Sequence, residues 1–138
     1  QGRAGRPTGN RREAVAFPTG KGPQVHVEGI AIDPRLEYVY DKPLVGRTLS
    51  GVPIGALLDA SLSSRALRER VKHVAQSDLT HSLKFDTQGN LCLTSLEWNA
   101  ITPQRPDGRT ELLAGSIGFP WPDTIAIGPD VDLLFSNA

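Results

Sequence analysis

The stretch HSLKFDTQGNLCLT (residues 81–94) decides the fold. Its two apolar segments, LKF and LCL, flank the turn-forming residues DTQGN, and a strand, a tight turn and a second strand are typical of a β-hairpin. The same pattern occurs twice more, without gaps, in EGIAIDPRLEYVYD from Glu28 and DTIAIGPDVDLLFS from Asp123. The chain therefore contains three copies of one predicted hairpin.

The spacing of the three hairpins indicates the architecture. Their starts lie 53 and 42 residues apart, and a spacing of roughly 40–50 residues is typical of the four-stranded blades of a β-propeller. Residues 48–52 and 100–102 are predicted to form third strands, and residues 111–114 a fourth strand after a turn at 106–108. The predicted fold class is all-β, with about three four-stranded propeller blades.

The first interval is longer because it holds a segment near residues 63–75 in which apolar side chains have helical spacing. The apolar positions are Leu67, Val71 and Val74. Ser63 or Ser64 can serve as the N-cap, so one short inserted helix is predicted there. An alternative for the whole chain is a small antiparallel sandwich, because a closed propeller needs at least four blades.

The charge of the 138 residues is balanced, with 15 Lys and Arg against 15 Asp and Glu. Residues 1–24 are rich in Gly and Pro and contain five basic residues against one acidic residue, so we predict a basic loop or flexible arm there. Residues 25–138 are assigned to the partial propeller. A neutral chain of this kind is not expected to bind nucleic acid.

Composition and motifs also argue against several other classes of protein. The single cysteine, Cys92, has no partner in this chain for a disulfide or a multi-cysteine zinc site, and its place in an apolar strand predicts burial. No apolar run approaches the roughly 18–20 residues of a membrane span, and the first residues show no signal peptide. No nucleophilic-serine, nucleotide-loop or metalloprotease motif occurs, so nothing in the sequence demands an enzyme.

The repeat itself selects the candidate site. Glu28, His81 and Asp123 occupy the same first position of the three hairpins. In a propeller the innermost strand of each blade lines a central channel and begins at one mouth, so we expect the three side chains to converge there. Two carboxylates and an imidazole suit a divalent cation such as calcium, with Glu28 and Asp123 as ligands, or acid–base chemistry. The alternative is that these residues only cap backbone amides.

Further residues are weaker candidates for ligand binding. Glu97 and Asn99 follow a predicted strand, where exposed loops often carry function, and their alternative role is to connect two strands. Trp121 and Trp98 each offer a flat face that can stack on an aromatic ligand. Their alternative role is to fill the space between blades.

Three longer stretches carry a family resemblance. They are VEGIAIDPRLEYVYDKPLVGRTLSGVPIGALLD (27–59), LKFDTQGNLCLTSLEWNAI (83–101) and PDGRTELLAGSIGFPWPDTIAIGPDVDLLFSNA (106–138). They resemble the major royal jelly protein/yellow family, particularly its bacterial members, and the most specific segments are WPDTIAIGPD and LEWNAI. The chain departs from the family in the middle hairpin, where His81-Ser82 stands in place of the usual Asp-Gly.

The resemblance implies a six-bladed β-propeller, related in fold to the senescence-marker-protein/gluconolactonase enzymes, of which this chain resembles the C-terminal half. It further implies binding of a small molecule or partner at the channel mouth and a secreted or periplasmic location. The alternative function, by analogy with the gluconolactonases, is a metal-dependent lactone hydrolase. Three blades leave two open faces, so we expect either a longer polypeptide or association of two copies.

Overall fold

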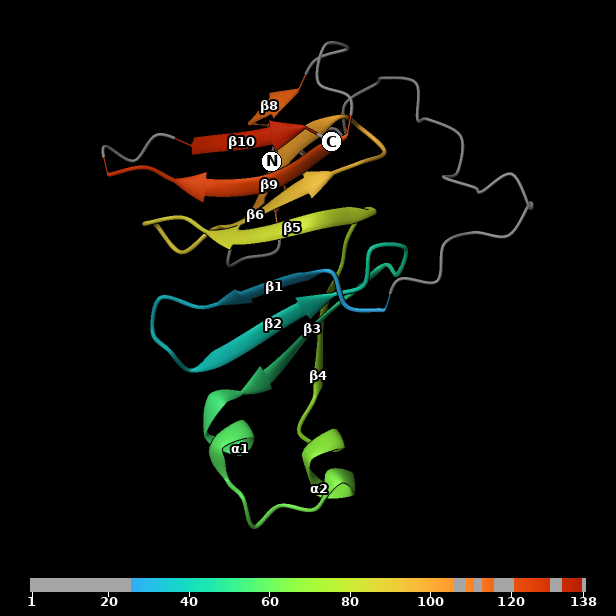
Figure 1. Cartoon of the computed structure of the whole chain (residues 1–138), viewed down its shortest axis with the longest axis vertical. Helices are drawn as coiled ribbons and strands as arrows, with labels where there is room; N and C mark the ends of the chain where they lie inside the picture. Colours follow the sequence, from blue (N-terminus) through green and yellow to red (C-terminus); the bar gives the residue numbers. More distant parts are fainter. Residues whose placement is uncertain (1–25, 106–108, 111–112, 116–120, 130–132, 138) are drawn as a thin grey trace, which may run out of the picture.

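The structure is a computed structural model that describes residues 26–105, 109–110, 113–115, 121–129 and 133–137. Their strands form three antiparallel sheets (Figure 1). The first sheet has the order β1 (Gly29–Ile32), β2 (Tyr38–Lys42), β3 (Thr48–Pro53) and β4 (Lys72–Gln76). The second sheet has the order β5 (Thr80–Phe85), β6 (Leu91–Ser95), β7 (Ala100–Gln104) and β8 (Ala114–Gly115). The third sheet pairs β9 (Pro122–Ile127) with β10 (Leu133–Asn137).

All three predicted hairpins are present, as β1–β2, β5–β6 and β9–β10. The predicted third strands are confirmed as β3 and β7. The predicted fourth strand at 111–114 is represented by the short β8, and residues 111–112 lie outside the described residues. The basic head at residues 1–24 and the turn at 106–108 also lie outside them.

An aspartate organises each of the first two hairpin turns. The carboxylate of Asp33 accepts hydrogen bonds from the backbone N–H of Arg35 at 2.8 Å and of Tyr38 at 2.6 Å. Asp86 accepts equivalent bonds from Gln88 at 2.9 Å and Asn90 at 2.8 Å. Such side-chain acceptors mimic a backbone turn, which explains why both hairpins begin their turns with Asp.

The first turn is one residue longer than the other two. Six residues separate the paired residues Ile32 and Val39, whereas five separate Phe85 from Leu91, and five separate Ile127 from Leu133. Because side chains alternate between the two faces of a strand, the extra residue turns the side chains of β2 to the face opposite that of the aligned residues in β6 and β10. The gapless sequence alignment therefore matches β1 with β5 and β9, but it does not match β2 with β6 and β10.

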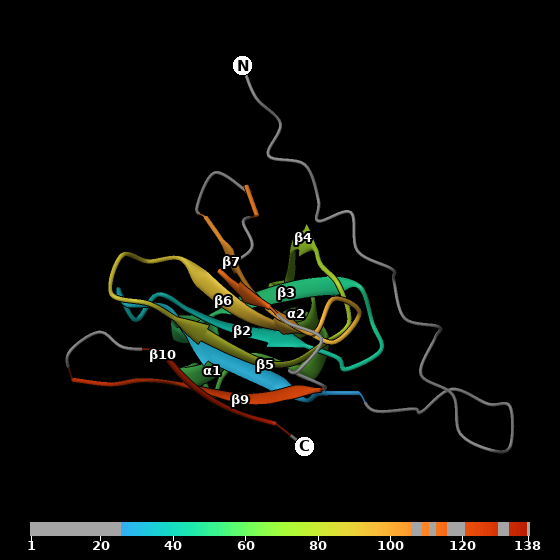
Figure 2. The ribbon, with the colours of Figure 1, turned by 90° about the horizontal axis from the view of Figure 1, so that it is seen from above.

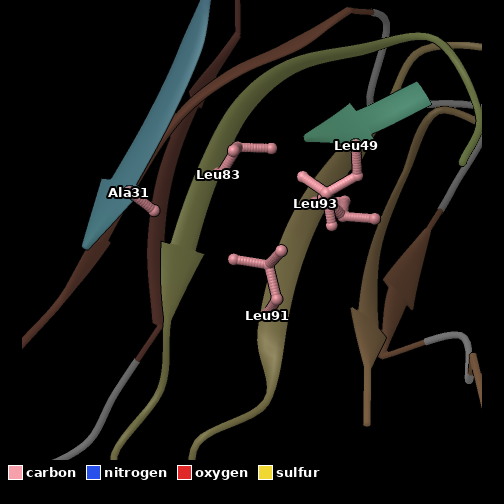
Figure 3. Close-up of a cluster of buried hydrophobic side chains, with 5 residues drawn as sticks. All are labelled: Ala31, Leu49, Leu83, Leu91 and Leu93. Atoms are coloured by element: carbon pink, nitrogen blue, oxygen red, sulfur yellow. The ribbon is translucent and has the colours of Figure 1, made fainter. Parts of the chain in front are cut away.

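Two apolar clusters join the sheets. The cluster between the first and second sheets consists of Ala31, Leu49, Leu83, Leu91 and Leu93, from β1, β3, β5 and β6 (Figure 3). Tyr40 packs on its edge with its ring edge-on to Phe85, at 5.2 Å between centroids. The cluster of the second and third sheets contains Cys92, Ile101 and Ile125. Cys92 is 1% exposed, as expected. Each fully buried leucine or isoleucine contributes about 1.5–3 kcal/mol.

The predicted helix at 63–75 is only partly correct. The structure has two short helices, α1 (Ile54–Leu58) and α2 (Ser64–Arg68), and Ser63 caps α2 by accepting a hydrogen bond from the N–H of Ala66. Residues 72–76 instead form β4, which pairs with β3. Figure 2, which views the molecule from above, shows β4 beside β3. Short helices are only marginally stable on their own. Pairing with β3 gives the backbone of residues 72–76 hydrogen-bond partners, so these residues form a strand and do not extend the helix. Neither helix approaches the length needed to cross a membrane.

Candidate functional site at the start of the inner strands

The three first-position residues are in contact. The ring of His81 lies between two carboxylates, with Nδ1 2.6 Å from Oδ1 of Asp123 and Nε2 3.3 Å from Oε1 of Glu28. Their side chains are 26–29% exposed, so the cluster is reachable from solvent but shielded from bulk water. The structure therefore brings together the three residues that the repeat selected.

The inner strands explain why these residues meet. Figure 1 shows β1, β5 and β9 side by side and pointing the same way, and both neighbouring pairs are in contact. Glu28 directly precedes β1, His81 is the second residue of β5, and Asp123 is the second residue of β9. Gly29 permits the close approach of β1 and β5, because a Cβ at this position would lie 2.8 Å from Cγ of Leu83. A larger residue beside Glu28 would force the strands apart.

A β-bulge aims His81 toward its partners. The pairing of β5 with β6 shifts between Thr80 and Leu83, so that His81 and Ser82 together stand opposite Thr94. The buried hydroxyl of Thr94 accepts hydrogen bonds from the N–H of His81 at 3.1 Å and of Ser82 at 2.8 Å. Bulges commonly redirect a side chain beside a functional site. Thr94 is therefore a positioning residue that sequence reasoning missed, since a threonine in a strand gives no signal of a bulge.

The arrangement fixes what each imidazole nitrogen can do. A neutral imidazole has one N–H donor and one acceptor nitrogen, whereas the imidazolium donates from both. Nδ1 lies beside the carboxylate of Asp123 and Nε2 beside that of Glu28, so the two carboxylates hold the ring in one orientation. A carboxylate that orients an imidazole in this way is a recurring element of acid–base sites.

The same geometry does not fit a cation shared by Glu28 and Asp123. The two carboxylates lie at opposite nitrogens of one ring, so an ion bound by both would have to displace His81. No cluster of three or more His, Cys, Asp or Glu side chains suited to a metal ion occurs among the residues that the structure describes.

Glu97 belongs to a different network, which links the first two sheets. Its side chain is 8% exposed and accepts two hydrogen bonds from the Arg47 guanidinium, at 2.8 and 2.9 Å, and one from the N–H of Leu79. Trp98 donates from Nε1 to Asp78 at 3.0 Å in the same region. These contacts tie the turn between β6 and β7 to Arg47, just before β3.

Lys42 is a buried charge near this network. Its side chain is fully buried, and Nζ donates hydrogen bonds to the carbonyl oxygens of Pro43 and Gly46. Burial, with a smaller contribution from the positive charge of Arg47, lowers the pKa of Lys42 to about 8. Sequence reasoning did not single out this residue, because nothing local distinguishes a buried lysine from a solvated one.

The remaining candidates, Asn99 and Trp121, both have a positive backbone φ. Asn99 has φ 48° in the turn between β6 and β7, and asparagine tolerates this left-handed conformation better than most residues. Trp121 has φ 54° directly before β9, an uncommon conformation for a bulky residue. Such outliers gather at functional sites. Trp121 stands two residues from Asp123, while Asn99 is accounted for by its turn.

A separate cavity of about 600 Å³ lies where the first two hairpins turn, at the ends of β1 and β5 away from the cluster. Its walls include Tyr40 and Phe85, with Asp33 and Gln88 from the two turns. None of the site residues expected from the sequence lines this cavity. The candidate site is therefore the Glu28–His81–Asp123 cluster.

Comparison with solved structures decides the architecture. A gluconolactonase from Xanthomonas campestris matches with a TM-score of 0.63 and 22% identity, over 82% of this chain and 35% of that one. A putative gluconolactonase matches with a TM-score of 0.61 and 19% identity, over 82% and 36%. A streptogramin B lyase matches with a TM-score of 0.59 and 15% identity, over 83% and 35%. The fold is that of β-propeller blades.

The three sheets are thus blades, and the all-β propeller prediction is confirmed over the sandwich alternative. The expected similarity in fold to gluconolactonase-type propellers is confirmed. The chain spans about a third of the length of these structures. It matches no known protein family model, and no curated protein matches it in sequence.

Proposed function

We propose that this chain forms part of a β-propeller that binds a small polar molecule at the channel mouth, through Glu28, His81 and Asp123. The observation that carries the proposal is the continuous contact of carboxylate, imidazole and carboxylate across three blades. Ligand sites in barrel- and propeller-like folds collect at the mouth, where a few polar groups converge on one point. Trp121, close to Asp123 in the chain, is proposed as an apolar wall of the same site.

The charges of the cluster define the class of ligand. Two carboxylates supply several hydrogen-bond acceptors and at least one net negative charge, even when the imidazole is protonated. An anion would be repelled, whereas a neutral molecule with several hydroxyl groups could donate to both carboxylates. We therefore propose a neutral polyhydroxylated ligand of the size of a sugar.

Calorimetric titration with two matched probes tests the proposal. The probes are 1,5-anhydroglucitol, a neutral cyclic polyol, and gluconate, an anion with a similar set of hydroxyls. We expect saturable binding of the polyol, weaker binding of gluconate, and a loss of polyol affinity of at least about tenfold in Asp123→Asn. Absence of saturable polyol binding, or equal affinity of wild type and Asp123→Asn, would overturn the proposal.

A second candidate is lactone hydrolysis, favoured by the 2.6 Å contact that orients His81 and by the solved gluconolactonases that share the fold. In this reaction Nε2 of His81 takes a proton from water while the water oxygen attacks the lactone carbonyl. The tetrahedral intermediate then breaks the ring C–O bond, and the imidazolium returns its proton to the leaving alkoxide. Asp123 holds the ring in place throughout.

Continuous titration of the acid released from glucono-1,5-lactone measures this activity. We expect a rate above the spontaneous rate for wild type, and the spontaneous rate alone for His81→Gln. Equal rates with wild type and with His81→Gln exclude hydrolysis at this cluster and leave the binding function. On the resemblance of WPDTIAIGPD and LEWNAI, we further propose that the chain is a distant relative of the royal jelly/yellow proteins.

A further inference from the structure

The first two blades form a cavity between their hairpin turns. It has a volume of about 600 Å³ and lies at the ends of β1 and β5 opposite to the Glu28–His81–Asp123 cluster. The described residues that line it all belong to these two blades, between positions 33 and 105. Small-molecule sites have volumes of roughly 300–1,000 Å³. The cavity is therefore large enough for a ligand of one or two rings.

The inner wall of the cavity is apolar and aromatic. Leu49 and Leu91, two members of the cluster in Figure 3, line it together with Val74, which is 49% exposed. Tyr40 from β2 and Phe85 from β5 also line it, and their rings pack edge to face across the boundary between the blades. Such rings favour contact with a further planar ring. The wall therefore suits an aromatic ligand.

The charged groups that line the cavity balance. They are two acidic residues, Asp33 and Glu37, and two basic residues, Arg35 and Arg105. The carboxylate of Asp33 is already engaged by backbone N–H groups of its own turn. Neither a cation nor an anion therefore meets a net opposite charge, and either would lose part of its hydration in a mostly apolar cavity. These properties favour a neutral ligand.

Two polar groups of the wall have no hydrogen-bond partner among the residues that the structure describes. Oε1 of Gln104, at the end of β7, is buried and unpaired. The second is the hydroxyl of Tyr40, and burial, with a smaller contribution from Asp33, raises the pKa of Tyr40, so this hydroxyl remains a donor. Buried polar groups are nearly always paired. A ligand hydroxyl could accept from Tyr40 and, once the amide of Gln104 turns toward the cavity, donate to Oε1.

We propose that this cavity binds a neutral aromatic molecule that carries a hydroxyl group, such as a phenol or a naphthol. The ring of the ligand packs on Tyr40, Phe85 and the leucines, and its hydroxyl donates to Gln104. The cavity is separate from the Glu28–His81–Asp123 cluster. The proposal therefore goes beyond the proposed function and does not depend on it.

Equilibrium dialysis with three matched probes tests the class of ligand. The probes are 2-naphthol, naphthalene, which lacks the hydroxyl, and 2-naphthoate, in which a carboxylate replaces it. At pH 7 we expect saturable binding of 2-naphthol, about three- to tenfold tighter than binding of naphthalene, which is the contribution of one hydrogen bond. 2-Naphthoate should bind more weakly than 2-naphthol. Absence of saturable 2-naphthol binding, or tighter binding of 2-naphthoate, would overturn the proposal.

The variant Gln104→Leu tests the assigned hydrogen bond. Leucine is close to glutamine in size but cannot accept a hydrogen bond, so this variant should bind 2-naphthol and naphthalene equally well. Gln76→Leu is the matched control, because Gln76 is exposed in β4 and does not line the cavity, and it should keep the wild-type preference. Circular dichroism checks that both variants are folded. A Gln104→Leu variant that still prefers 2-naphthol would contradict the proposal.

Chemical-shift mapping locates the bound ring. On saturation with 2-naphthol, the amide signals of Gln88 and Gly89, which line the cavity, should move. The amide signals of His81 and Asp123, in the cluster at the opposite ends of the strands, should stay in place. Shifts at His81 and Asp123 without shifts at Gln88 and Gly89 would place the ligand at the channel mouth and overturn the proposal.

Discussion

Replacement of Thr94 by valine removes the acceptor that holds the bulge behind His81. The substitution keeps the shape of the side chain but leaves the N–H groups of His81 and Ser82 without their hydrogen bonds of 3.1 and 2.8 Å. Each buried N–H that loses its acceptor costs about 1–3 kcal/mol. Because the strand can relax in part toward solvent, we expect the free energy of unfolding to fall by roughly 2–4 kcal/mol, which lowers Tm by roughly 4 °C per kcal/mol in a chain of this size.

Urea unfolding followed by circular dichroism measures the effect. Thr94→Ser keeps the acceptor oxygen and should lose much less stability than Thr94→Val. Thr102→Val is a second control, because Thr102 is also buried but its hydroxyl makes only a 3.5 Å contact with the carbonyl of Leu93. We expect it to cost less than about 1 kcal/mol. If Thr94→Val were no more destabilising than Thr102→Val, the role assigned to the bulge would be refuted.

Three further outcomes are expected from the same unfolding measurement. Gly29→Ala should lower the free energy of unfolding by about 1–3 kcal/mol, because the added Cβ would lie 2.8 Å from Leu83. Gly55→Ala is the control: this helical position has open space around it, and the substitution should raise the free energy of unfolding by roughly 0.5–1 kcal/mol. Equal effects of the two substitutions would argue against the close contact of β1 and β5. Leu36 is 70% exposed and has φ 58°, a left-handed conformation that asparagine tolerates better than leucine. Leu36→Asn should therefore raise the free energy of unfolding by about 0.5–1 kcal/mol, and a decrease would contradict the strain assigned to this turn. Since burial lowers the pKa of Lys42 from 10.5 to about 8, the folded protein binds fewer protons than the unfolded chain above pH 8. Stability should then rise by about 1 kcal/mol between pH 7 and 9 in wild type but not in Lys42→Met; equal slopes would count against this assignment.

The sequence was sufficient for the fold class and for the residues that meet. Hairpins restart at equivalent positions, and inner strands of a propeller run side by side in one direction, so equal positions in the repeat become neighbours in space. The repeat alone therefore selects Glu28, His81 and Asp123 together. Gly29 and the bulge at Thr94 could not be found in this way, because both depend on how two sheets or strands approach each other.

Two predictions failed in part for local reasons. Leu67, Val71 and Val74 have helical spacing, yet Val74 lies in β4, because pairing with β3 satisfies the backbone of residues 72–76. The gapless alignment of the hairpins could not reveal the longer first turn, since the extra residue is absorbed between Asp33 and Tyr38 by hydrogen bonds to one carboxylate. Contacts distant in sequence, such as Arg47 with Glu97, leave no periodic signal at all.

The central claim is that three blades hold the ring of His81 between the carboxylates of Glu28 and Asp123, and the most direct test is NMR of the His81 ring nitrogens. In long-range ¹H–¹⁵N correlation spectra, the exposed His26 and His73 serve as internal references. We expect His81 to carry a slowly exchanging, downfield-shifted proton on Nδ1 that is lost or shifted upfield in Asp123→Asn. A His81 ring in the wild-type protein whose Nδ1 proton exchanges rapidly, with no downfield shift relative to the two reference histidines, would contradict the account.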